Sequence, residues 1–283
     1  MSISERERSE LAQINRSGRQ PVVLIHGLWL LPSSWKRWER FLEERGFAAF
    51  SVDWPGDAES VEAARRDPSA LARLGVQDVA AHIEQVIDGL DRRPMLIGHS
   101  FGGLLAQMLA GRGRSSATVA IDPAPFKGIR ALPLSVLRAT FPVLRNPRNR
   151  TRTVTLTPEQ FRFGFANDVD ASTADRLHAE YHVPGPGRPI FQSAVANVSF
   201  SRAIAVDRRN PERGPLLVIG GTADNTVPVS LSRAAYKKQS KNPGLTEFAT
   251  IDGAAHSLVF DHRWSEVAAT AADFLARPDV SLR

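Results

Sequence analysis

The sequence predicts an α/β fold, a mainly parallel sheet with helices on both faces, plus a helical cap insertion. Three observations lead to this prediction. Apolar runs and helical patterns alternate between residues 21 and 122. The alternation stops near Pro123 and resumes at Pro215, and the stretch between these prolines contains only helical patterns, divided by proline and glycine. Because alternating strands and helices build parallel sheets covered on both faces, the intervening stretch is best explained as an insertion.

The length and composition suit one substantial domain with such an insertion. The chain has 283 residues, 42% apolar and 23% charged, which is ordinary for a globular protein and argues against disorder. We divide it into a polar N-terminal segment (1–20), a core (21–124 and 210–276), a cap or lid (125–209) and a C-terminal tail (277–283).

The elements follow from hydrophobic periodicity. Apolar runs predict strands at 21–25, 47–52, 94–98, 117–122, 215–219 and 246–251. Helical patterns in the core predict helices at 34–45, 77–90 and 101–111. Those in the cap cover 133–141, 158–165, 171–181 and 189–199.

One serine lies where a strand, a sharp turn and a helix follow each other. Gly98-His99-Ser100-Phe101-Gly102 comes after the run Pro94 to Ile97 and before a stretch of small and apolar residues. Such a turn strains the serine backbone, needs small residues two positions away on each side, and exposes the hydroxyl. The Phe101 N–H, at a helix N-terminus, would point at the same place. The pattern favours a nucleophile over an ordinary tight turn with a capping serine.

A serine nucleophile needs a histidine base. Among the seven histidines, His256 stands out because it lies in a loop of small residues after the strand 246–251. His262 lies at the start of a terminal helix, where a surface position fits better. His178 and His182 are four residues apart on a predicted helix, a spacing that can bind metal. No third ligand is evident near them, so we predict no metal site.

The acid that would orient the base has two candidates. Asp224 follows the strand 215–219, and Asp122 closes the strand next to that of the serine. We favour Asp224, with Asp122 as the alternative. All three catalytic candidates then follow strands at their carboxyl ends, where ligands and catalytic groups of parallel sheets gather.

These segments together resemble the α/β-hydrolase family, in particular its serine esterase and lipase-like members with a helical cap. The resemblance lies in GHSFGG (98–103), GTADNTVP (221–228), GAAHS (253–257) and HGLW (26–29). It covers roughly residues 20 to 125 and 210 to 276. The N-terminal segment looks too short and too charged for the family's first antiparallel strand pair, so we expect six or seven strands.

The resemblance also implies roles around the serine. The N–H of Leu28 would complete the oxyanion hole with that of Phe101, and His26 would buttress the loop. Asp53 and Asp57 fit loop-structuring roles. For a largely apolar substrate pocket, the tentative residues are Trp29, Phe126, Phe161 and Phe191.

The predicted function is a serine hydrolase that cleaves a carboxylic ester or related acyl compound through a Ser-His-Asp acyl-enzyme mechanism, without a cofactor. Thioesters, lactones, peroxyacid formation and cyanohydrin cleavage remain alternatives, because the fold does not fix the reaction. Cyanohydrin lyases rely on a positive charge, and Lys127 is the only lysine of the insertion. A non-catalytic small-molecule receptor is a further alternative.

Composition limits the possible partners. The chain has no cysteine, which excludes disulfides and thiol catalysis. Its net charge is +6, with a cluster of arginines at positions 138, 145, 148, 150 and 152. This cluster lacks the interleaved aromatics of a single-strand platform, so we predict a solvated loop and no nucleic acid, with an anionic substrate or acyl carrier as the alternative. No run is long enough for a membrane span and the N-terminus lacks an apolar leader, which favours the cytoplasm. The expected partner is a small acyl substrate with an apolar part, and the oligomeric state stays open.

Overall fold

The computed structural model describes residues 3–131 and 133–281. Residues 1, 2, 132, 282 and 283 lie outside this part, and with them the ends of the segments 1–20 and 277–283 and one position of the segment 125–209.

Within the described residues, six parallel strands form one sheet in the order β2-β1-β3-β4-β7-β8. This confirms the predicted fold class and strand number. The strands are β1 (Pro21–Ile25), β2 (Ala48–Ser51), β3 (Met95–His99), β4 (Thr118–Ile121), β7 (Leu216–Gly221) and β8 (Thr246–Ile251). The four strands from β1 to β7 in this order are buried along their whole length, as expected of a sheet covered on both faces.

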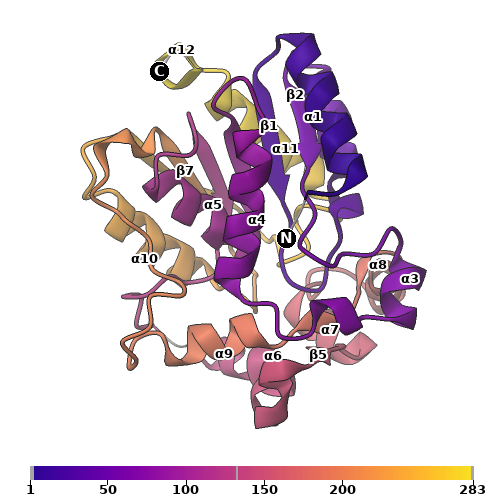
Figure 1. Cartoon of the computed structure of the whole chain (residues 1–283). Helices are drawn as coiled ribbons and strands as arrows, with labels where there is room; N and C mark the ends of the chain where they lie inside the picture. Colours follow the sequence, from indigo (N-terminus) through magenta and orange to yellow (C-terminus); the bar gives the residue numbers. More distant parts are fainter. Residues whose placement is uncertain (1–2, 132, 282–283) are drawn as a thin grey trace.

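Helices cover both faces of the sheet (Figure 1). In that view α4 and α5 lie in front of the strands and α11 lies behind them. Helix α2 contacts α11, and α10 packs on β7 and β8. The core helices are α2 (Lys36–Glu43), α3 (Val61–Arg66), α4 (Val76–Asp88), α5 (Phe101–Gly111), α10 (Val229–Gln239) and α11 (Trp264–Leu275). A short helix, α12 (Pro278–Ser281), follows in the C-terminal tail.

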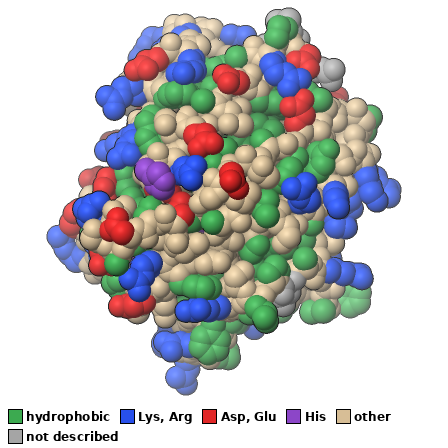
Figure 2. All heavy atoms as spheres, turned by 180° about the vertical axis from the view of Figure 1, so that it is seen from behind, with side chains coloured by type: hydrophobic (Ala, Val, Ile, Leu, Met, Phe, Trp, Pro, Cys, Tyr) green, Lys and Arg blue, Asp and Glu red, His purple; other side chains and the backbone are tan. Residues whose placement is uncertain are grey.

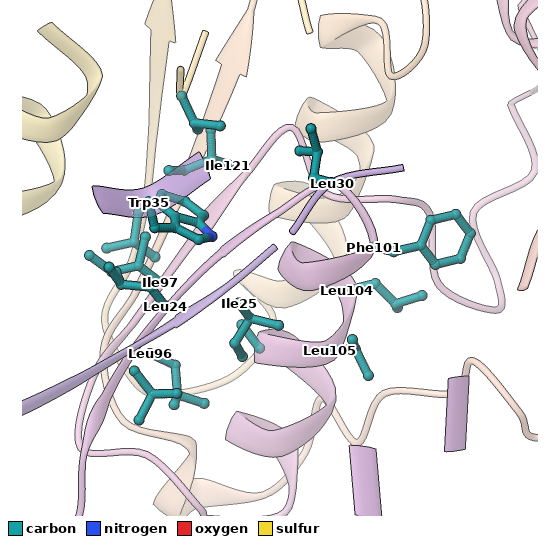
Figure 3. Packing of buried hydrophobic residues seen from close by; sticks show 14 of the residues in the cluster. Leu24, Ile25, Leu30, Trp35, Leu96, Ile97, Phe101, Leu104, Leu105 and Ile121 are labelled. Atoms are coloured by element: carbon teal, nitrogen blue, oxygen red, sulfur yellow. The ribbon is translucent and has the colours of Figure 1, made fainter. Parts of the chain in front are cut away.

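The largest apolar cluster lies between these layers. Figure 3 shows members of this cluster from α5, such as Leu104 and Leu105, and from the strands, such as Ile25 and Ile97. All four side chains are at most 1% exposed. Burial of a side chain of this size contributes about 1.5–3 kcal/mol, so this cluster fixes α5, and the turn that precedes it, on the sheet.

The segment between β4 and β7 forms helices at one end of the molecule, the lower end in Figure 1. They are α6 (Leu134–Leu144), α7 (Pro158–Gly164), α8 (Ala171–Tyr181) and α9 (Arg188–Val195), with a short antiparallel pair of β5 (Thr153–Val154) and β6 (Gly185–Pro186). The predicted helix at 133–141 extends to Leu144 with Pro142 in its last turn, and that at 189–199 ends at Val195.

An arginine joins this segment to the core. The Arg65 guanidinium, on α3, donates hydrogen bonds to the carbonyl oxygens of His178 and His182 at the end of α8, both at 2.8 Å. The last carbonyls of a helix have no partner within the helix and attract cations, so Arg65 caps α8 from the core.

The N-terminal segment, described from the sequence only as polar, contains a helix, α1 (Glu5–Ser17). The Ser4 hydroxyl accepts from the Glu7 N–H, and the Glu7 carboxylate accepts from the Ser4 N–H. This capping box was a sequence signal for the helix. Glu7 is fully buried and also accepts a hydrogen bond of 2.9 Å from His82 Nε2 on α4.

Glu7 should therefore stabilise the fold in a pH-dependent way. Burial opposes its ionisation, but the hydrogen bonds from His82 and the Ser4 backbone hold its pKa below the ordinary 4.5. A lowered carboxyl pKa means stability that is present above pH 4.5 and is lost as the pH falls through the folded-state pKa. We expect Glu7→Gln to lower the free energy of unfolding at pH 7 by about 2 kcal/mol.

The check is urea unfolding of Glu7→Gln and of Glu5→Gln, an exposed residue of the same helical turn, from pH 7 down to pH 3. The loss of unfolding free energy relative to the wild type should shrink with falling pH in Glu7→Gln and stay near zero in Glu5→Gln. A deficit of equal size at every pH would contradict the assignment.

Candidate active site

Ser100 lies at the tip of the turn between β3 and α5. Its backbone has φ 57° and ψ −120°, outside the regions that a residue with a side chain prefers. The turn is held by hydrogen bonds from the Ser100 N–H to the Ile121 carbonyl, at 3.0 Å, and from the Ala124 N–H to the Ser100 carbonyl, at 2.9 Å. The neighbouring strand thus maintains the strained conformation that the sequence pattern predicted.

The glycines on both sides of Ser100 are required by close backbone contacts. A Cβ atom at Gly98 would lie 2.1 Å from the Gly102 carbonyl oxygen, and one at Gly102 would lie 2.0 Å from the Ile25 carbonyl oxygen. A Cβ at Gly27 would lie 2.8 Å from the Ser100 Cβ. The turn therefore has no room for a side chain in any of these three directions.

His256 and Asp224 form a buried pair. The Nδ1 atom of His256 lies 2.5 Å from the Asp224 Oδ2, and both side chains are inaccessible to solvent. The other oxygen of Asp224 accepts hydrogen bonds from the Thr226 and Val227 N–H groups, at 2.7 and 2.8 Å. These bonds fix the carboxylate, which in turn orients the imidazole and leaves Nε2 without a hydrogen-bond partner among the described residues.

Two aromatic rings enclose the His256 imidazole. His99, the neighbour of Ser100, has its ring centroid 4.6 Å from that of His256, and Phe165 meets it edge-on at 4.9 Å. Burial and the nearby His256 charge hold the pKa of His99 well below its usual range, so His99 is neutral. Since His99 and Ser100 are consecutive, this contact joins the serine turn to the His256 loop.

Asp122, the alternative acid, lies beside Asp224 and is fully buried. One of its oxygens accepts a 2.8 Å hydrogen bond from the Gly221 N–H. Burial and the negative charge of Asp224 raise the pKa of Asp122 well above its usual range. A neutral Asp122 can donate its proton to the Asp224 carboxylate, whereas the bond to His256 belongs to Asp224.

The loop after β1 faces the serine turn. The His26 imidazole hydrogen-bonds the Asp57 carboxylate at 2.9 Å and stacks on Trp54, so it supports the loop. Asp53 accepts hydrogen bonds from Ser4 and Arg6 and is not near the His256 pair. Among the described residues, neither the Leu28 N–H nor the Phe101 N–H has a hydrogen-bond acceptor, and Phe101 begins α5.

A cavity of about 330 Å³ opens onto Ser100, within the usual range for small-molecule sites. Residues of the core and of the segment 125–209 line it together. Its walls are mainly apolar and include Trp29, Phe101, Leu137, Leu156, Phe165 and Ile190. The Trp29 indole is fixed by a 3.0 Å hydrogen bond to the Val154 carbonyl.

The structure places three of the tentative pocket residues elsewhere. Phe126 and Phe161 are buried and do not line the cavity, and Phe191 lines a separate surface groove. Sequence analysis missed Phe165, which stacks on Phe161 one helical turn away. The spacing of these two residues was the available signal, but only the packing decides which ring reaches the cavity. Arg130, also missed, lines the outer part of the cavity.

A family model, the alpha/beta hydrolase family, matches residues 22–270. The chain belongs to this family. Solved structures with the same fold include a monoacylglycerol lipase from Paleococcus ferrophilus (22% identity, TM-score 0.63, covering 90% of this chain and 93% of that one). Another is an esterase from Thermogutta terrifontis (18% identity, TM-score 0.65, covering 90% of this chain and 89% of that one). A third is a methylesterase from Arabidopsis (15% identity, TM-score 0.63, covering 91% of this chain and 99% of that one).

The remaining histidines of this alpha/beta hydrolase lie outside the Ser100 cavity. The Leu156 N–H donates to His182 Nε2, and His178 Nε2 lies 3.1 Å from the Leu156 carbonyl oxygen. Burial, followed by the charge of His178, lowers the pKa of His182 to about 3. His262 is on the surface. Lys127 donates to the carbonyls of Ser199 and Ser201 and does not line the cavity.

Two groups of side chains bring three potential metal ligands together among the described residues. They are Asp122, Asp224 and His256, and Asp168, Asp261 and His262. Hydrogen bonds already occupy Asp224 and His256 in the first group and Asp261 in the second. Neither group offers a set of free ligands. No described helix is both long and apolar enough to cross a bilayer.

The glycine contacts generate a stability prediction. Gly98→Ala should lower the free energy of unfolding by about 3 kcal/mol or more, because the new methyl group meets backbone that cannot move aside. Gly75→Ala is the matched control, since a Cβ there meets only the ends of flexible side chains, at 3.2 Å or more. Thermal and urea unfolding measure both. Equal, small effects would show that the turn can relax.

Proposed function

We propose that the protein is a serine hydrolase that cleaves carboxylic esters with an apolar acyl group, with Ser100 as nucleophile, His256 as base and Asp224 as orienting acid. The observation that carries the proposal is the 2.5 Å contact between His256 Nδ1 and Asp224, which leaves Nε2 free beside the Ser100 turn. The division into a core (21–124 and 210–276) and a cap (125–209) belongs to the same proposal, since both parts line the cavity.

The mechanism has two acyl-transfer steps. His256 Nε2 takes the proton of the Ser100 hydroxyl as its oxygen attacks the ester carbonyl. The N–H groups of Leu28 and Phe101 bind the resulting oxyanion. His256 then gives the proton to the departing alcohol, and an acyl-serine remains. Water, deprotonated by His256, attacks the acyl-serine and releases the carboxylic acid with Ser100 restored.

The residues around Ser100 and His256 have different roles. Asp224 holds the His256 tautomer and stabilises the imidazolium that forms in each step. Asp122 positions Asp224 rather than His256, since it is neutral and bonded to the Gly221 N–H. Trp29, Leu137 and Ile190 offer an apolar surface for the acyl group.

Replacement of Ser100 tests the reaction class. We expect Ser100→Ala to lower kcat on p-nitrophenyl esters by about 10⁶-fold, because no other group supplies the nucleophile. The assay uses a series from acetate to long acyl chains. Ser232→Ala is the control, since Ser232 is buried on α10 and its hydroxyl has no hydrogen-bond partner among the described residues.

The pattern of activity separates the alternatives. Turnover that survives in Ser100→Ala would remove the proposed mechanism. Wild-type protein inactive on every ester would favour a thioester, a lactone or cyanohydrin cleavage. Tight ligand binding without turnover, unaffected by Ser100→Ala, would identify a receptor.

The two acids give a separate prediction. Asp224→Asn should lower kcat by about 10⁴-fold, because an amide favours the wrong His256 tautomer. Asp122→Asn should keep kcat within about tenfold, because an amide retains both the acceptor for Gly221 and a donor for Asp224. The same ester assay and thermal unfolding measure both variants. A larger loss of kcat in Asp122→Asn than in Asp224→Asn, at unchanged stability, would exchange the two roles.

A further inference from the structure

One end of the molecule carries exposed apolar side chains. All large apolar residues that are exposed within the described ranges lie on α6, at the last residue of α9 or just after α9, and we call this surface the α6/α9 face. They are Leu134, Leu137, Phe141, Val195, Val198 and Phe200. Phe200 is fully exposed, and Val198 and Leu134 are 87% and 82% exposed. A contiguous apolar surface of this kind marks an interaction site.

Helical geometry and hydrogen bonds bring these residues onto one surface. Leu134, Leu137 and Phe141 follow the spacing i, i+3, i+7, which places them on one side of α6. Helix α6 contacts α9. Asn197 accepts from the Gly128 N–H at 2.7 Å and donates to the Ile129 carbonyl at 2.6 Å, which fixes the turn after α9 beside the start of the segment 125–209.

The same face is strongly basic. The segments 126–157 and 181–206 contain no aspartate or glutamate. Their exposed arginines that form no ion pair within the described parts of the chain are Arg130, Arg138, Arg145, Arg148, Arg150, Arg152 and Arg202. Figure 2 shows hydrophobic and basic side chains together at the lower end of the molecule. The arginine cluster seen in the sequence thus lies on α6 and in the turn after it, and Arg150 lines a surface groove together with Val195.

The α6/α9 face is continuous with the mouth of the Ser100 cavity. Leu137 lines the cavity and is 42% exposed, so it belongs to both surfaces. Arg130 also lines the cavity and reaches the exterior. A molecule held on this face therefore lies next to the entrance.

We propose that the α6/α9 face docks on an anionic lipid surface, so that lipid esters pass from that surface directly into the Ser100 cavity. Leu134, Val198 and Phe200 insert among the acyl chains, and the surrounding arginines bind the lipid phosphates. A helix that presents leucine and phenylalanine on one side, with basic residues beside it, is typical of such peripheral binding. Basic residues near an anionic membrane add favourable electrostatic energy within a Debye length. The docking stands on this face alone, whereas its catalytic consequence rests on the proposed function.

A lipid surface explains the face better than an acidic acyl carrier does. The most exposed apolar side chains lie on a helix and a turn and line neither the Ser100 cavity nor the groove at Phe191. A fluid lipid layer accommodates such side chains without a matching cavity, whereas a protein partner needs complementary pockets.

The test is co-sedimentation of the full-length protein with vesicles of phosphatidylcholine alone and of phosphatidylcholine mixed with phosphatidylglycerol. We use the Ser100→Ala background, so that binding is measured without turnover. Binding should be at least about tenfold tighter to the anionic vesicles and should weaken when the salt concentration rises.

Two double variants separate charge from apolar insertion. Arg145→Glu with Arg148→Glu, and Val198→Ser with Phe200→Ser, should each weaken binding to the anionic vesicles by about tenfold or more. None of these four residues lines the Ser100 cavity, and all are exposed, so hydrolysis of a soluble short-chain ester should not change. Lys237→Glu with Lys241→Glu makes the same change of charge on exposed residues in and after α10 and should leave binding intact.

Each outcome bears on the docking proposal separately from the proposed function. Absence of vesicle binding, or binding that the Val198 and Phe200 replacements leave unchanged, overturns the lipid surface and leaves an acidic protein as the partner. An equal loss in the Lys237 and Lys241 control shows attraction by net charge only and also overturns it. Docking as expected, with a wild type that hydrolyses no ester, supports the surface and contradicts only the proposed reaction.

Discussion

The close approach between the Ser100 turn and the two central strands is the constraint on which the site depends. Gly98 and Gly102 let the start of α5 pack against β3 and β1 at distances that no Cβ atom permits. This contact maintains the strained φ of Ser100, with the strand hydrogen bond to Ile121. It also directs the N-terminus of α5 toward the cavity, with the Phe101 N–H, which has no acceptor in the described part of the chain. Backbone packing therefore decides the position of both the hydroxyl and a hydrogen-bond donor.

The polar groups behind the turn form a second layer whose charges are set by burial. Two backbone N–H groups donate to the Asp224 carboxylate. Burial and the neighbouring Asp224 raise the pKa of Asp122 well above its usual range. His99 is neutral and packs on His256 without competing for its hydrogen bonds. In this small buried volume the pKa of Asp122 is raised and that of His99 is lowered. Perturbed pKa values of this kind gather at functional sites.

The inserted segment connects the site to its surroundings. Arg65 of the core fixes the end of α8, and the Leu156 N–H donates to the His182 imidazole within the segment. Helices α6 and α9 enclose the cavity and carry exposed apolar and basic residues. The side of α6 that carries Leu134, Leu137 and Phe141 is exposed next to the cavity entrance. Leu137 therefore belongs both to the cavity wall and to the exposed α6/α9 face.

The sequence by itself determined the parallel sheet, the insertion, and the candidate residues at the strand ends, because these depend on local patterns of apolar residues, glycines and turns. It also contained the capping box of α1, a local signal for that helix. Only the tertiary structure decided that His256 bonds Asp224 and not Asp122, because both acids follow strands at the same sheet edge and their contacts arise between distant segments. The tertiary structure also decided that Phe165 and not Phe161 lines the cavity. It likewise decided that one apolar side of α6 is exposed. Periodicity shows that a helix has an apolar side, but only packing shows whether another element covers it.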